Sequence, residues 1–206
     1  MNSSEQDVLL IFIKNPEFGK VKTRLAKSVG PETACLVYEQ LLEITRNVTS
    51  KVNCDRQLWY SEYIDNDDRW SEEHYRKKLQ HGQNLGERMS NAFEQAFMEG
   101  YEHAVIIGSD CAALKKSHLV NAYSILQNHD VVIGPSQDGG YYLLGMNQYL
   151  PDLFENMEWS TPSVYDETIR RIKRMNLMYE AVEELNDIDT EKDLMESRLR
   201  VKGNEN

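Results

Sequence analysis

Four cationic side chains and a glycine follow the first strongly apolar run of the chain, Val8–Ile13, which predicts a buried β-strand. In an open α/β sheet, ligands bind outside the carboxyl ends of the strands. Lysine and arginine supply charge for phosphates, and glycine lets the backbone approach a ligand. We therefore expect this segment to bind the phosphates of a nucleotide-bearing substrate, although a solvated basic loop is the alternative when the segment is taken alone. Its residues are Lys14, Gly19, Lys20, Lys22 and Arg24.

A carboxylate follows the second strong apolar run, which covers residues 103–108. Asp110 falls just past the carboxyl end of this predicted strand. Mg²⁺ prefers hard oxygen ligands, and one or two carboxylates together with substrate phosphates complete such a site. Asp110 is thus our leading candidate for a metal ligand. The structural alternative is an N-cap for a helix beginning near Leu114, and the two roles are compatible.

Asp138, Gly139 and Gly140 lie between two further predicted strands, residues 131–134 and 141–146. Paired glycines predict a tight hairpin, since they adopt positive φ without strain. They also let a sugar or a phosphoryl acceptor lie against the backbone. We therefore expect both glycines to approach the ligand and Asp138 to touch ligand or metal-bound water.

Two more carboxylates, Asp187 and Asp189, follow a predicted strand near residues 179–185. If the chain is still extended there, we expect only one of the two to face the site, and we favour Asp189 as a second metal ligand. Thr190 and Asp193 have the spacing of a capping pair for the last helix.

A weaker signal comes from Gly86 and Arg88, near the start of a predicted helix. The amides of a helix amino terminus can meet an anion, so both residues are candidates for phosphate binding, while a purely structural role is equally compatible with the pattern. Trp159 is expected to be a packing residue.

Short apolar runs alternate with amphipathic segments along the whole chain, which predicts a Rossmann-like α/β fold with a mostly parallel sheet and helices on both faces. Predicted strands cover residues 8–13, 57–60, 78–80, 103–108, 131–134, 141–146 and 179–185. Predicted helices begin at Pro31, near Leu85, near Leu119, around Ser163 and after Thr190.

Composition narrows the function classes. The 206 residues carry 34 acidic and 23 basic side chains, a formal net charge of -11, so a protein that coats a nucleic-acid polymer or an anionic membrane is disfavoured. Three cysteines without CxxC spacing fit a reducing cytoplasm. We find no apolar run long enough for a membrane span and expect a single cytoplasmic domain over residues 1–206. The five histidines lack zinc-hydrolase spacing, and neither a P-loop nor a dinucleotide fingerprint is present.

Six ordered motifs between Leu9 and Leu194 resemble those of a bacterial and archaeal glycosyltransferase-like family related to 2-phospho-L-lactate guanylyltransferase. They are IFIKNPEFGKVKTRL, QNLGERM, GSDC, GPSQDGGYYLLG, WST and DIDT. The resemblance implies a nucleotide-diphospho-sugar transferase fold of the GT-A type. It also implies that Asp110 binds a metal, Mg²⁺ or Mn²⁺, that Lys14, Lys22 and Arg24 contact phosphates, and that Asp189 is a possible second metal ligand.

Nucleotidyl transfer is therefore our leading hypothesis: a phosphate or hydroxyl of a small-molecule acceptor attacks the α-phosphorus of a nucleoside triphosphate. Lys22 and Arg24, together with Lys14, would act in catalysis by holding the phosphates and the leaving group in line. Mg²⁺ held by Asp110, with Asp189 or Asp138 helping, would neutralise the developing charge. One alternative is glycosyl transfer from a nucleoside-diphosphate sugar, for which Asp138 is the candidate base near the acceptor. The other is a nucleotide-binding regulator without catalysis.

Overall fold

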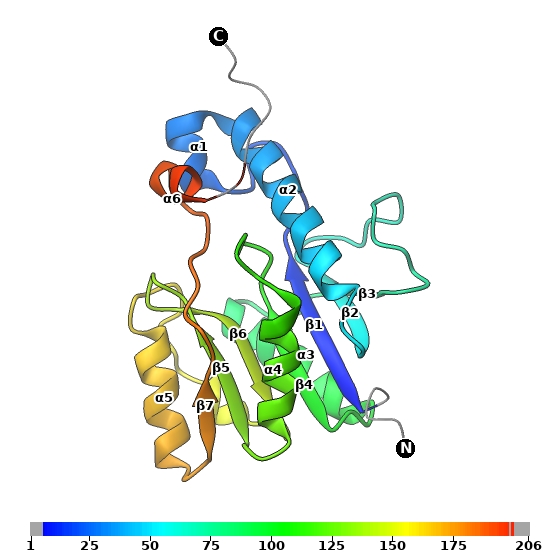
Figure 1. The fold of residues 1–206 in the computed structure, drawn as a ribbon, viewed down its shortest axis with the longest axis vertical. Coiled ribbons are helices and arrows are strands. Elements are labelled where there is room, and N and C mark those ends of the chain that lie inside the picture. The colour runs from blue at the N-terminus through cyan, green and yellow to red at the C-terminus, as the bar shows by residue number, and fades with distance from the viewer. Residues whose placement is uncertain (1–5, 198, 200–206) are drawn as a thin grey trace.

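The computed structural model describes residues 6–197 and 199, which form one seven-stranded sheet flanked by helices (Figure 1). The strands are β1 (Asp7–Ile13), β2 (Asp55–Tyr60), β3 (Arg76–Leu79), β4 (His103–Ile107), β5 (Val131–Pro135), β6 (Tyr141–Met146) and β7 (Tyr179–Ala181). The helices are α1 (Thr23–Val29), α2 (Pro31–Thr49), α3 (Leu85–Met98), α4 (Lys116–Leu126), the 3₁₀ turn η2 (Pro151–Leu153), α5 (Val164–Arg174) and α6 (Glu191–Glu196).

The sheet is mixed but mostly parallel, in the order β3-β2-β1-β4-β6-β5-β7. Only β6 runs against its neighbours β4 and β5, because residues 136–140 return the chain directly from β5 in a hairpin. The turn contains Gly139 at φ 87°, so the paired glycines do form the predicted hairpin. The predicted fold class, a mostly parallel α/β sheet covered on both faces, is confirmed.

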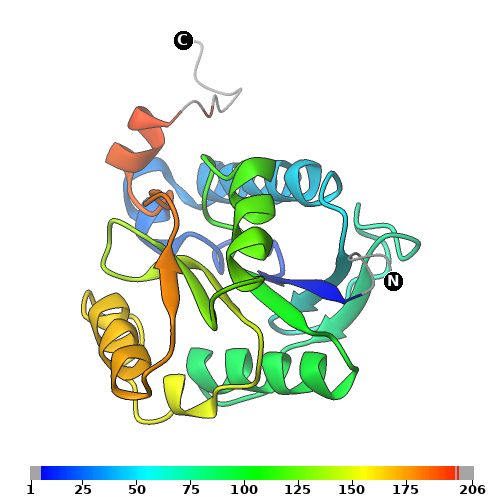
Figure 2. The ribbon, with the colours of Figure 1, turned by 60° about the horizontal axis from the view of Figure 1, so that its bottom comes forward.

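Two apolar cores lie on opposite faces of the sheet because side chains alternate along each strand. In β1, Leu9 and Ile11 pack with α2 and α4, whereas Val8 and Leu10 pack with α3 and α5. Figure 2 shows these two helix layers on either side of the sheet. β1 is buried along its whole length, as its uninterrupted apolar run predicts.

Three local details differ from the sequence expectation. The short helix α1 was not predicted, because its seven residues carry little apolar periodicity and only Leu25 is buried. α4 begins at Lys116 with Lys115 at the N-cap, so the alternative role of Asp110 as a cap is wrong. β7 ends at Ala181 rather than Leu185, and the charged, exposed Glu183 and Glu184 follow it.

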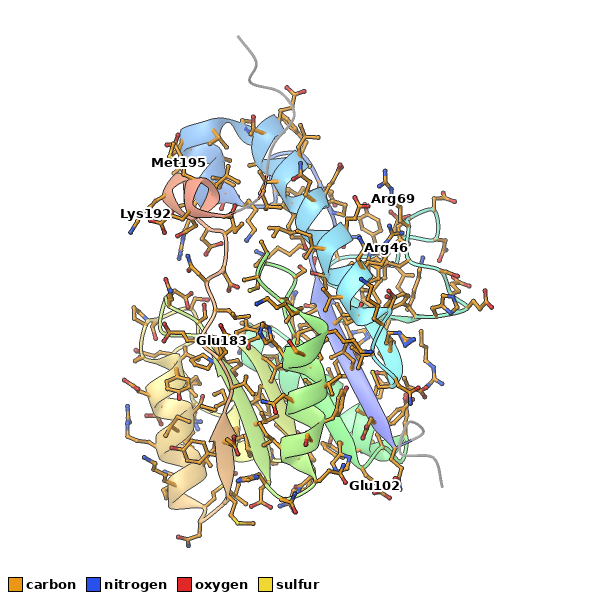
Figure 3. The ribbon with its side chains drawn as sticks, in the orientation of Figure 1. Arg46, Arg69, Glu102, Glu183, Lys192 and Met195 are labelled. Atoms are coloured by element: carbon orange, nitrogen blue, oxygen red, sulfur yellow. The ribbon has the colours of Figure 1, made fainter. Side chains whose placement is uncertain are left out.

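The carboxyl ends of β1, β4 and β5 point to the same end of the molecule, since these strands are parallel within one sheet. In Figure 3, Lys192 and Met195 on α6 mark this end, beside α1, and Glu102 marks the amino end of β4. The loops that carry the candidate site residues therefore leave the sheet at one rim. None of the described helices is long and apolar enough to cross a lipid bilayer.

Candidate functional site

Lys22 is the central cation of the site. It precedes α1 in a left-handed backbone conformation, φ 47° and ψ 44°, and its side chain is only 3% exposed. Its Nζ lies 2.8 Å from Asp110 Oδ1 and 3.1 Å from Asp189 Oδ1. Burial alone lowers the pKa of this ammonium, but the two carboxylates outweigh that effect and hold the pKa above its ordinary value. Lys22 is thus charged, and it joins segments that are 167 residues apart in sequence.

Two buried polar side chains fix the loop that carries these cations. The Tyr38 hydroxyl accepts from the Lys14 amide at 2.8 Å and lies 3.0 Å from Ser109 Oγ, which ties the loop after β1 to the loop after β4. Asn15 is 3% exposed, and its Nδ2 donates to the Tyr63 carbonyl at 2.9 Å. These hydrogen bonds hold the backbone of the loop in place, while the side chains of Lys14 and Arg24 remain exposed to solvent.

Asp187 and Asp189 both line the cleft, which corrects the expectation that only one of them would face it. Residues two apart along an extended segment point to the same side, so the two carboxylates belong together. Ile188 between them is buried in the core, and its amide donates to the Asp110 carbonyl at 3.0 Å. This hydrogen bond sets the acidic segment beside the loop after β4.

Burial, followed by the negative charge of Asp110, raises the pKa of the Asp187 carboxyl to about 7. The negative charges of Asp110, Asp138 and Asp189 raise this pKa, and the nearby ammonium of Lys22 lowers it. Asp189 is instead paired with Lys22 and, at 3.6 Å, with Arg24. Neighbouring carboxylates thus have different charge environments.

These side chains surround a cleft of about 530 Å³ at the rim of the sheet. A volume of this size is typical of small-molecule sites. Seven of the candidates predicted from the sequence line it: Lys14, Lys22, Arg24, Asp110, Asp138, Gly140 and Asp189. Cationic and acidic segments from β1, β4, the β5–β6 hairpin and the chain after β7 therefore converge on one cavity.

Five other candidates do not line this cleft: Gly19, Lys20, Gly86, Arg88 and Gly139. Lys20 forms an ion pair with Glu17 at 2.5 Å instead. The Arg88 guanidinium donates to the Gly82 carbonyl at 3.2 Å. At the start of α3, Asn84 accepts from the amide of Glu87, so this helix end is capped by its own side chains.

Two of the three glycines among them, Gly86 and Gly139, have packing roles. A Cβ at Gly86 would lie 2.1 Å from the Trp159 indole nitrogen, and a Cβ at Gly139 would lie 2.1 Å from the Pro162 carbonyl oxygen. Trp159 also stacks on Phe154, with ring centroids 6.4 Å apart. The predicted packing role of Trp159 is therefore confirmed, and the side chain in addition forms part of the cleft wall.

Sequence reasoning missed three further residues of the cleft, Tyr38, Gln80 and Tyr142. Tyr38 was assigned to the apolar face of α2, which is correct for its ring but hides the role of its hydroxyl. Gln80 follows the edge strand β3 and donates to the Ile13 carbonyl at 3.2 Å. Tyr142 donates to the Glu183 carbonyl at 3.0 Å. A single polar atom at the end of a side chain does not alter the apolar periodicity of the sequence, so these roles were not predicted.

Asp110 and Asp189 are the side chains that best fit a divalent cation. Both are more than a third exposed, both present carboxylate oxygens, and both are held by a single ammonium, so they lie within reach of one cation. Within the described ranges, no group of three His, Cys, Asp or Glu side chains is placed to hold a metal ion. A site here would need oxygens from the substrate.

The fold and the rim cleft define a protein of the nucleotide-diphospho-sugar transferase type. A crystal structure from Desulfovibrio desulfuricans G20, described as such a transferase, superposes with a TM-score of 0.86 and 32% identity, over 92% of this chain and 85% of that one. The 4-diphosphocytidyl-2C-methyl-D-erythritol synthase of Anaerococcus prevotii DSM 20548 shares the fold at 12% identity, with a TM-score of 0.58 over 94% and 96% of the two chains.

Residues 44–161 match the family described as "Uncharacterized protein conserved in bacteria (DUF2064)", and the chain belongs to this family. It is also 26% identical over 141 residues to a 2-phospho-L-lactate guanylyltransferase of Methanocaldococcus vulcanius, a match that covers 66% of this chain. That match spans 60% of the length of the archaeal relative.

Proposed function

We propose that this protein is a nucleotidyltransferase that uses a nucleoside triphosphate. An oxygen of the acceptor attacks the α-phosphorus and forms a new P–O bond, while the bond from that phosphorus to the β-phosphate bridging oxygen breaks. The bond's electron pair leaves with pyrophosphate, and any proton on the attacking oxygen passes to solvent or to a carboxylate of the cleft. In such transfers the protein contributes mainly by positioning and by electrostatic stabilisation.

The observation that carries the proposal is the placement of Lys22. The buried and charged Lys22 lines the cleft, together with the exposed cations Lys14 and Arg24. Cations placed before the reaction stabilise the charge that develops on the leaving phosphates without reorganisation. Lys22 would hold the phosphate nearest the reacting bond, and Arg24 and Lys14 would hold the outer phosphates.

The charge balance of the cleft supports a divalent cation, Mg²⁺ or Mn²⁺. Among the described residues, three cationic side chains and four carboxyl groups line the cavity, so the protein alone does not neutralise a triphosphate. Asp110 and Asp189 would hold the ion, which when bound supplies Lewis-acid neutralisation of phosphate charge. The Lys22 ammonium contacts the same two carboxylates, so the cation and the candidate metal ligands are part of one charged cluster.

Asp138 lies at the acceptor side of the proposed reaction. Its Oδ1 accepts from the Gly140 amide at 2.9 Å, which fixes the carboxylate at the hairpin turn, and the side chain lines the cleft. We propose that it receives a hydrogen bond from the acceptor. The three cysteines are free thiols, which supports a cytoplasmic location.

Glycosyl transfer from a nucleoside-diphosphate sugar is the second candidate, because the Desulfovibrio desulfuricans relative carries that description. The same cations would then hold a departing diphosphate. The products separate the two candidates: pyrophosphate marks nucleotidyl transfer, and a free nucleoside diphosphate marks glycosyl transfer. A non-catalytic regulator would bind nucleotide and form neither product.

Thermal-shift titration with nucleoside triphosphates and nucleotide sugars tests the donor class, since ligand binding raises apparent stability by mass action. We expect a triphosphate to stabilise the protein in the presence of Mg²⁺, and Asp110→Asn to abolish that effect while the protein remains folded. Asp67→Asn, at an exposed carboxylate outside the cleft, is the matched control and should behave as wild type. Absence of Mg²⁺-dependent stabilisation by every triphosphate would contradict the proposal.

A further inference from the structure

The cleft is chemically two-sided, and the division follows the sheet. Its charged side is built on the face that packs with α2 and α4, where Val21, Tyr38 and Cys111 belong to one apolar core. Its other side is built on the face that packs with α3 and α5. We call this second side the apolar wall, which consists of Phe12, Leu85, Met89, Ile106, Tyr141 and Trp159.

The apolar wall carries a large hydrophobic side chain that the fold leaves uncovered. Leu85, in the first turn of α3, is 45% exposed although it lines the cavity. An apolar side chain that is held at the edge of a concave site marks a place where a ligand excludes water. Trp159 beside it is held by Gly86 and Phe154, so this part of the wall is preformed.

The apolar wall carries two polar groups, the Tyr141 hydroxyl and the Trp159 indole N–H, and the side chains of Gln80, Asp138, Ser160 and Thr161 line the same cleft. The Tyr141 hydroxyl has a thioether as its hydrogen-bond partner, Met89 Sδ at 4.0 Å, which is a weak acceptor. It can therefore form one hydrogen bond to a ligand. Among the described residues that line the cleft, the lysines and arginines are Lys14, Lys22 and Arg24, and none of them belongs to the wall.

This distribution of charge bears on the charge that an acceptor can carry. An acceptor such as 2-phospho-L-lactate, for which the archaeal relative is named, carries a phosphate and a carboxylate. Burying such anions without cationic partners is costly. The three cations of the cleft face four carboxyl groups, and in the proposed function they are engaged by the donor.

We propose that the apolar wall is the acceptor subsite and that it takes an uncharged molecule with an apolar or aromatic body and a hydroxyl group. The assignment of this ligand as the acceptor rests on the proposed function. The body of the acceptor would lie on Leu85 and Trp159, the Tyr141 hydroxyl would bind its polar group, and its hydroxyl oxygen would be the nucleophile.

Ligand-observed saturation-transfer NMR on the full chain, without nucleotide, tests the subsite directly. The probes are 2-phenylethanol, a neutral aromatic alcohol, and 2-phospho-L-lactate. We expect 2-phenylethanol to bind wild type, and Leu85→Asn to weaken its binding about fivefold, because the ligand covers the exposed part of that leucine. Met98→Asn is the matched control: Met98 is 78% exposed on the same helix but outside the cleft, and binding should be unchanged.

Each outcome decides the inference. Failure of 2-phenylethanol to bind, binding that Leu85→Asn leaves unaltered, or displacement of 2-phenylethanol by 2-phospho-L-lactate overturns it. Binding of 2-phospho-L-lactate without displacement places that acid on the charged side and supports the apolar wall. Because no nucleotide is present, failure of the proposed donor chemistry leaves this result unaffected, and the two proposals can fail separately.

Discussion

Replacement of Lys22 by methionine is the sharpest test of the charge arrangement in the cleft. The substitution keeps an unbranched side chain that is one atom shorter, and it leaves Asp110 and Asp189 without their shared ammonium partner. Removing one partner of a fully buried ion pair costs about 3–5 kcal/mol. The two carboxylates here are 37% and 39% exposed, so solvent screens them, and we expect a loss of about 1–3 kcal/mol in the free energy of unfolding.

Urea denaturation at neutral pH, with and without Mg²⁺, measures this effect. In metal-free buffer Lys22→Met should unfold at a lower urea concentration than wild type, with an unchanged m-value. Mg²⁺ should restore part of the lost stability, because the two carboxylates are then free for the ion. At a concentration ten times its dissociation constant, a bound ion contributes about 1.4 kcal/mol.

Lys27→Met is the matched control, since Lys27 lies exposed on α1, the helix that Lys22 precedes, and no ion pair to it is found among the described residues. It should unfold as wild type does and should show the wild-type response to Mg²⁺. The reasoning is refuted if Lys22→Met is as stable as wild type in metal-free buffer. An equal gain from Mg²⁺ in wild type, Lys22→Met and Lys27→Met would show that the ion binds elsewhere.

Three further predictions concern single groups of the site. Because the folded-state pKa of Asp187 is raised to about 7, the folded chain binds a proton more tightly than the unfolded chain, and stability falls as pH rises from about 4 to 7, by at most about 1.4 kcal/mol per pH unit. Asp187→Asn should remove that slope in metal-free urea titrations, and an unchanged slope would contradict the assignment. Gly139→Ala should lower the free energy of unfolding by more than about 2 kcal/mol, since φ is 87° and the new Cβ would meet the Pro162 carbonyl. Gly140→Ala is the comparison, because a Cβ there meets only the Asp138 side-chain carboxylate, at 3.2 Å. Equal melting temperatures of the two variants would disprove this. Tyr38→Phe should cost about 1–3 kcal/mol and weaken triphosphate binding, because the Lys14 amide loses its acceptor; calorimetric titration showing wild-type affinity would oppose that view.

Much of the fold could be predicted from local sequence. The apolar runs at residues 8–13 and 141–146 are β1 and β6 to within one residue, because buried strands need continuous apolar side chains. Pro31 begins α2 as expected. The capping pair Thr190 and Asp193 begins α6, since a cap depends only on residues three apart.

The candidate site could be predicted only in part. The types and positions of Lys22, Arg24, Asp110 and Asp189 indicated an anion and metal site at strand ends, and the structure does bring them together. The packing role of Gly86 could not be predicted from the local sequence, because it depends on Trp159, which lies 73 residues later. The Trp159 indole occupies the space that a Cβ at position 86 would need. The orientation of Asp187 likewise depended on the hydrogen bond between Ile188 and the loop after β4.

By itself, the sequence determined which elements form and which chemical groups stand at their ends, because helix caps, strand periodicity and turn glycines act over a few residues. Only the tertiary structure decided that the cleft has one charged side and one apolar side. That division arises because the sheet separates two apolar cores, and the cavity at the rim of the sheet is lined by residues from both of them. Side chains from distant segments acquire a shared environment, and hence their charge state, only when the chain has folded.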